Sequence, residues 1–202
     1  MRFFKEHLDN IVRLIVFQVG IAIFSFFLYT AAGAISSDNT TSLGIKVGIS
    51  VFSIVFYLTL IHTMMWEEGA KDKIRVQSGR SKKTAFKGMG IAFCANIFNF
   101  VITGIALISM ATYMLGGSEW LKTVFGFMNL IFRMLLSMYL GIIQIICNPL
   151  AASEDLYFLM QTVCFFAFPV ISIIGAHISY SLGYAERRIF GFLDVNNKNK
   201  KK

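Results

Sequence analysis

Long runs of apolar residues without any charge alternate along the chain with short charged stretches. About 20 apolar residues cross the hydrocarbon of a bilayer, and a charge at its centre costs about 2.5–3.5 kcal/mol on insertion scales. Four charge-free runs are long enough to be spans, at 14–37, 47–66, 88–118 and 156–185. A lone helix satisfies its own backbone in lipid, and no alternation typical of barrel strands is visible, so each run predicts a helix.

A fifth segment, 120–148, is apolar but contains an arginine. Its polar or small residues recur every three or four positions, which places them in one narrow stripe along a helix. They are Lys122, Gly126, Asn129, Arg133, Ser137, Gly141, Gln144 and Asn148. Such a helix can span with its stripe toward protein, lie at the interface, or re-enter from one side.

The pattern predicts an all-α, polytopic helical membrane bundle with four clear spans and this fifth amphipathic, re-entrant or interfacial helix. We expect the helices near 8–36, 43–68, 85–115, 119–148 and 154–188. Residues 1–190 are expected to form a single transmembrane domain. Residues 191–202 form a basic tail that is too polar to pack, and we expect it to be disordered and cytoplasmic.

The first run follows basic residues and contains Ala32, Gly33 and Ala34, so a cleavable signal peptide is an alternative to a first span. Signal peptides use an apolar region of about 7–15 residues. The run at 14–37 is longer, which favours an uncleaved span.

Composition agrees with the membrane prediction. The chain is 56% hydrophobic and only 15% charged, whereas about a quarter of the residues in a soluble domain are charged. The net charge of +8 comes from basic residues clustered between apolar runs. That distribution is typical of membrane topology and not of a nucleic-acid interface.

The positive-inside rule favours four crossings. With four, 16 Lys and Arg lie on the side of the N-terminus and 2 on the other; with five, the numbers are 10 and 8, leaving Arg133 aside. We therefore expect both termini and the 67–87 loop in the cytoplasm, in a cytoplasmic (inner) membrane. The 120–148 helix would then turn its stripe toward water or headgroups in the outer leaflet, and Arg133 would need no buried partner.

Polar residues within the apolar runs are the candidates for an intramembrane site: Asn96, Asn99, Arg133, Gln144 and His177. Small and polar residues also serve helix packing, which is the simpler interpretation. None of the four runs contains Asp or Glu. That absence disfavours a carboxylate-based proton or sodium mechanism, but it is compatible with an anion near Arg133.

Basic residues directly beside the membrane attract anionic lipid headgroups by about 1 kcal/mol each. The candidates are Lys71, Lys73, Arg75, Arg80, Lys82 and Lys83. The alternative is that these residues only determine topology.

No zinc-protease, nucleophile-elbow or P-loop motif occurs in the sequence. Glu67 and Glu68 resemble the paired carboxylates of the CAAX-type intramembrane proteases, but the arginine of that motif is replaced by Asp72. Cys94, Cys147 and Cys164 form no Cys-x-x-Cys pair, and we expect neither a metal nor a cofactor.

These observations favour a non-enzymatic accessory or scaffold membrane protein. The alternative is a transporter or channel component for a small anionic solute, which would need a cavity lined by Asn96, Asn99, Arg133 and Gln144. A remote third reading, an intramembrane hydrolase, requires Glu67, Glu68 and His177 to converge. The expected partners are the bilayer, its anionic headgroups, and another membrane protein or a second copy; nucleic acid is not expected.

Overall fold

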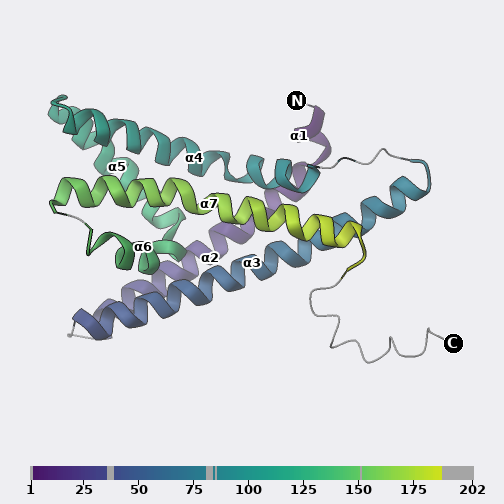
Figure 1. Ribbon diagram of the computed structural model, residues 1–202, viewed down its shortest axis with the longest axis horizontal. Helices are drawn as coiled ribbons and strands as arrows, with labels where there is room; N and C mark the ends of the chain where they lie inside the picture. The colour runs from purple at the N-terminus through teal and green to yellow at the C-terminus, as the bar shows by residue number, and fades with distance from the viewer. Residues whose placement is uncertain (1, 36–38, 81–83, 85, 151, 188–202) are drawn as a thin grey trace.

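Four long helices lie side by side in the computed structural model, which describes residues 2–35, 39–80, 84, 86–150 and 152–187 (Figure 1). They are α2 (Leu8–Ile35), α3 (Asn39–Gln77), α4 (Lys87–Met114) and α7 (Glu154–Tyr184). A short helix, α1 (Arg2–Glu6), precedes α2. The chain between α4 and α7 forms α5 (Glu119–Leu135), the 3-10 turn η1 (Ser137–Tyr139) and α6 (Leu140–Cys147). The described residues contain no strand, and the all-α prediction is confirmed.

Each of the four long helices is long and apolar enough to cross a membrane. Large apolar side chains such as Phe27, Phe98 and Ile108 stay exposed on the outside of the bundle. A soluble protein rarely leaves so much apolar surface in water, so these side chains are suited to contact lipid. The chain is therefore a helical membrane protein.

Helix α3 is longer than its apolar run predicts, because it continues through the charged residues after Trp66 to Gln77. Glu67 and Lys71 pair one turn apart on this extension, at 2.7 Å. Such pairs stabilise a helix in water. The apolar run therefore indicated where α3 can contact lipid, and not where the helix ends.

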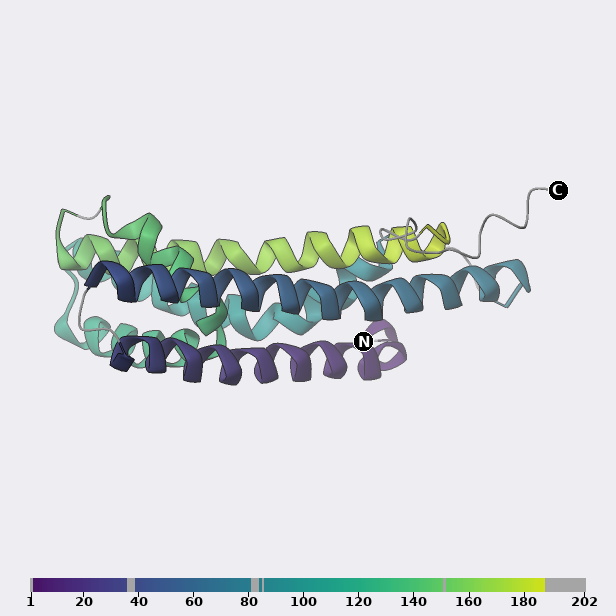
Figure 2. The same ribbon diagram turned by 90° about the horizontal axis from the view of Figure 1, so that it is seen from below.

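The predicted single helix at 119–148 is wrong, because the segment bends by 81° between α5 and α6. Both ends of the bent pair lie at the same end of the bundle (Figure 2). Near the start of α5, Lys122 lies 3.8 Å from Asp155 at the start of α7. A chain that returns to the end where it entered has the shape of a re-entrant loop, and whether 119–148 crosses the bilayer stays a prediction.

Polar groups at the bend find partners on neighbouring helices. The Ser137 hydroxyl donates to the Ala22 carbonyl of α2 at 2.6 Å, and the Gly141 amide donates to the Ser50 hydroxyl of α3 at 2.8 Å. Gly141 also lies so close to the Lys46 carbonyl that a Cβ atom would overlap it. A broken helix is tolerated in a membrane only where its freed backbone groups are satisfied in this way.

Close backbone contact joins α3 and α7. A Cβ on Gly183 would overlap the Trp66 carbonyl of α3, and a Cβ on Gly69 would overlap the Tyr180 carbonyl of α7. One turn before Gly183, Ser179 lies 3.0 Å from Nδ1 of His62. The series Gly175, Ser179 and Gly183 thus serves helix packing, as small residues at fixed spacing predict.

We expect Gly183→Ala to destabilise the protein by about 1–3 kcal/mol, because the added methyl group meets backbone atoms of Trp66 that cannot rotate away. Gly48→Ala on the open side of α3 is the matched control, since nothing lies within 4 Å of its Cβ position. There the alanine should stabilise by about 0.5–1 kcal/mol through helix propensity. Thermal unfolding in detergent measures both, and equal shifts in the two variants would contradict the packing assignment.

Candidate functional site

A buried charged cluster joins the end of α3 to the start of α4. The Lys87 ammonium lies 2.9 Å from a Glu68 oxygen and 2.7 Å from a carboxylate oxygen of Asp72. The same Asp72 oxygen accepts a 2.7 Å hydrogen bond from the Tyr180 hydroxyl of α7. Only 6% of Lys87, 9% of Glu68 and 8% of Asp72 is exposed. The cluster therefore ties three helices together at one end of the bundle.

Arg75 adds a second cation to this cluster, 3.2 Å from Asp72 and 3.7 Å from Glu68. The two carboxylates and the two cations balance in charge. Buried charges require such pairing because their desolvation is costly. The loop residue His7 lies nearby. Its burial, and next the Lys87 ammonium, lower the pKa of His7, so its imidazole is neutral at pH 7.

The charged cluster was missed at the sequence level, where its residues were taken as one loop. The available signal was the four-residue spacing of Glu68 and Asp72, which places both carboxylates on one face if the helix continues. Lys87 faces them only because α4 packs back against α3. Lys87 is at the opposite end of the 67–87 segment from Glu68 and Asp72, so their contact leaves no local pattern in the sequence.

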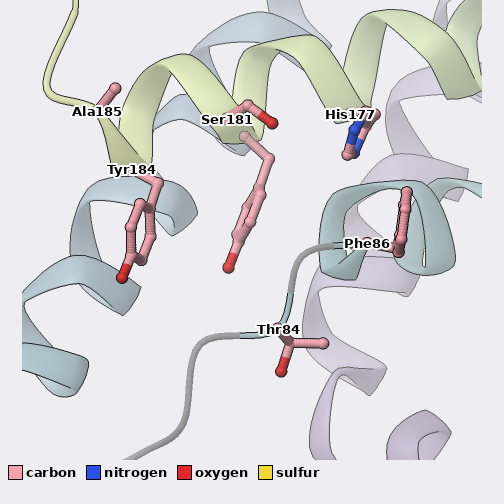
Figure 3. A pocket seen from close by; sticks show the side chains of 7 residues that line it. Thr84, Phe86, His177, Ser181, Tyr184 and Ala185 are labelled. Atoms are coloured by element: carbon pink, nitrogen blue, oxygen red, sulfur yellow. The ribbon is translucent and has the colours of Figure 1, made fainter.

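A recess of about 380 Å³ lies beside the charged cluster (Figure 3). Its lining residues are Thr84, Phe86, His177, Tyr180, Ser181, Tyr184 and Ala185. The Phe86 ring stacks on the His177 ring, with centroids 5.6 Å apart. Nδ1 of His177 is buried and has no hydrogen-bond partner among the described residues. The Tyr180 hydroxyl donates to Asp72. The lining of the recess is mainly aromatic, with the rings of Phe86, His177, Tyr180 and Tyr184.

Arg133 on α5 faces protein and not headgroups, which corrects the predicted orientation of the polar stripe. Its guanidinium donates to the Gln161 side-chain oxygen of α7 at 3.0 Å. Gln144 on α6 accepts a 2.8 Å hydrogen bond from the Tyr29 hydroxyl of α2. Phe132, beside Arg133 in the chain, is fully buried. The re-entrant pair thus turns part of its polar stripe into the bundle.

Asn96 and Asn99 lie elsewhere, between α4 and α7. Asn99 donates to the Asn96 side-chain oxygen at 3.0 Å, and Asn96 donates to the Ser172 hydroxyl at 3.3 Å. Only 3% of Asn96 and 4% of Asn99 is exposed. Asn99 also borders an apolar cavity of about 200 Å³. The five predicted intramembrane residues therefore form separate groups: the asparagines, the Arg133 and Gln144 pairs, and His177 at the aromatic recess.

Three of the basic residues expected to contact lipid have carboxylate partners instead. Lys71 pairs with Glu67, Lys73 lies 2.9 Å from Glu186, and Arg75 belongs to the charged cluster. Arg80 is exposed. Lys82 and Lys83 lie outside the described residues, as does the whole predicted tail, 191–202.

The geometry offers little for hydrolysis. Glu67 pairs with Lys71 on the exposed face of α3, whereas Glu68 points into the charged cluster. His177 is at the same end of the bundle, but its ring stacks on Phe86. Across the described ranges, no group of three or more His, Cys, Asp or Glu is arranged to hold a metal.

Comparison of the chain with protein-family models, with curated proteins and with solved structures finds no match. The functional argument therefore depends on these contacts alone.

We expect Lys87→Met to destabilise the protein by about 3–5 kcal/mol, because it leaves two buried carboxylates without their shared cation. Lys71→Met, which removes an exposed cation of the same type from α3, should change stability by less than about 1 kcal/mol. Thermal unfolding in detergent compares them. Adding Glu68→Gln and Asp72→Asn to Lys87→Met should recover much of the loss; no recovery would contradict the charge explanation.

Proposed function

We propose that this protein is a non-enzymatic accessory or scaffold component of a membrane, whose interior polar groups hold its helices together. The observation that carries this proposal is the pairing of Asn96 with Asn99 and Ser172 in an almost fully buried seam. Interhelical bonds of this kind contribute about 0.6 kcal/mol each on average. Side chains that bind a solute would keep hydrogen-bond donors free toward a cavity. The amides of Asn96 and Asn99 instead donate to groups within the protein.

Tight backbone packing supports the same proposal. Gly183 and Gly69 bring α3 and α7 into direct contact, and a Cβ on Gly88 of α4 would lie 2.6 Å from Cβ of Tyr180. Alternating access moves one helix group against another around a fixed site. Glycine contacts and the buried charged cluster both oppose such movement at this end of the bundle.

For topology, we propose that the end of the bundle with the charged cluster faces the cytoplasm. The starts of α2 and α4 and the ends of α3 and α7 meet there (Figure 1). Most Lys and Arg residues belong to the segments on this side. Anionic headgroups are the partner we propose for this face, with the exposed Arg80 providing attraction; Lys82 and Lys83, outside the described residues, are further candidates from the sequence.

Cysteine-accessibility labelling tests this topology after Cys94, Cys147 and Cys164 are replaced. Single cysteines at Ser78 and Asn199 should react from one side, and cysteines at Asn39 and Glu119 from the other. Labelling of Asn199 from the same side as Asn39 would mean five crossings and would refute the proposed arrangement.

Anion transport is the second candidate, since Arg133 has no carboxylate within ion-pair distance among the described residues. A flux assay with chloride- and nitrate-loaded proteoliposomes separates it from the scaffold. We expect no flux above that of empty liposomes. Flux that is lost in Arg133→Gln but retained in Lys122→Gln would overturn the scaffold proposal in favour of transport.

A further inference from the structure

We propose that Arg133 and Lys46 form a fixed binding site for an oxyanion, such as the phosphate group of a lipid or a free phosphate ion. The site lies where α5 bends into α6, against α2, α3 and α7. Its residues, called the Arg133 site below, are Tyr29, Lys46, Arg133, Gln144, Tyr157 and Gln161. The proposal goes beyond the scaffold function, because a static ligand needs neither a transport path nor a reaction.

The Arg133 site lies within the apolar part of the bundle. Gln161 follows the start of α7 by two turns, which is roughly 10 Å at 1.5 Å per residue. Tyr29 precedes the end of α2 by a similar length. The exposed Glu154 at the start of α7 marks the water side of this end. Half of the hydrocarbon is roughly 15 Å thick, so Arg133 is well inside the span region.

Among the residues that the structure describes, neither cation of this site has a carboxylate within ion-pair distance. The guanidinium of Arg133 donates instead to the neutral side chain of Gln161. The Lys46 ammonium lies 5.1 Å from the centre of the Tyr29 ring. Lys87, by contrast, has two carboxylates. Since an ionised side chain within a membrane is costly without a partner, the missing group is an anion.

Unused donors indicate the kind of anion. A guanidinium carries five N–H groups in a planar fork, and Nε of Arg133 is buried without a partner. Tyr157 lies one turn before Gln161 on α7, and the Tyr29 hydroxyl donates to Gln144. Arginine with tyrosine hydroxyls suits the several acceptor oxygens of a phosphate or carboxylate better than a single halide ion.

Helix polarity offsets the positive charge of this site only in part. Arg133 is in the last turn of α5, where the helix dipole contributes about half a negative charge. That partial charge offsets the charge of Arg133 only in part, and it does not offset the charge of Lys46. A bound anion would therefore still be stabilised.

Ligand-dependent thermal unfolding of the full-length protein in neutral detergent tests the proposal. The probes are inorganic phosphate and, separately, phosphatidylglycerol against phosphatidylcholine in mixed micelles. We expect one anionic probe to raise Tm by several degrees in the wild type, and its identity distinguishes a free anion from a lipid headgroup. Arg133→Gln should lose the shift. Lys122→Gln removes a cation from the same helix that already has Asp155 and Tyr113, and it should keep the shift.

Gln161→Glu provides a second test that does not depend on the folding of Arg133→Gln. It places a carboxylate 3.0 Å from the guanidinium, so we expect a higher Tm without probe and no further rise with either probe. Gln18→Glu, at a buried glutamine that lines an apolar cavity, should lower Tm. Absence of any probe-dependent shift in the wild type would overturn the proposal and indicate water at Arg133. A shift of equal size in Gln161→Glu would overturn it too.

Discussion

The constraint on which this structure depends is that hydrocarbon provides no hydrogen-bond partner, so polar groups inside the bundle must find one in the protein. The re-entrant pair shows the consequence most clearly. Its bend would be costly in lipid, but Ser137 bonds to the Ala22 carbonyl and the Gly141 amide bonds to Ser50. Helices α2 and α3 therefore make the bend possible, and the bend in turn brings α5 and α6 back to the same end of the bundle.

The same constraint divides the charges of the protein into two kinds. Lys87 is buried at one end with Glu68 and Asp72, and this charged cluster neutralises itself while it connects α3, α4 and α7. Arg133 lies in the opposite half with only an uncharged amide beside it. The first arrangement is structural, because all its members are engaged. The second has unused donors and net positive charge, which is why it carries the proposed ligand.

Small residues complete the arrangement by letting helices approach until their backbones touch. Lipid tails are as apolar as leucine, so helix association in a membrane depends on close packing and interhelical bonds more than on the hydrophobic effect. Gly183 against Trp66 and Gly69 against Tyr180 provide that packing between α3 and α7. A bundle held in this way keeps side chains in place, as a scaffold or a fixed binding site requires.

The sequence by itself determined the helical membrane architecture and the approximate place of the four long helices. Charge-free runs longer than a bilayer is thick have no other stable form in lipid, and the spacing of Gly175, Ser179 and Gly183 indicated a packing face. The basic residues also favoured an even number of crossings, which stays a prediction. These features are local, since each depends on residues within one helix or its flanks.

Only the tertiary structure decided which polar residues meet. The Asn96, Arg133 and His177 positions looked alike as isolated polar residues in apolar runs, yet their partners come from other helices: Ser172, Gln161 and Phe86. The charged cluster was hidden for the same reason, because Lys87 reaches Glu68 only after α4 folds back on α3. The pattern did not predict the 81° bend either. The residues that form hydrogen bonds with the bend, Ala22 and Ser50, are far away in the sequence. Contacts between distant segments depend on how helix faces pair, and a periodic pattern within one helix carries no information about its neighbour.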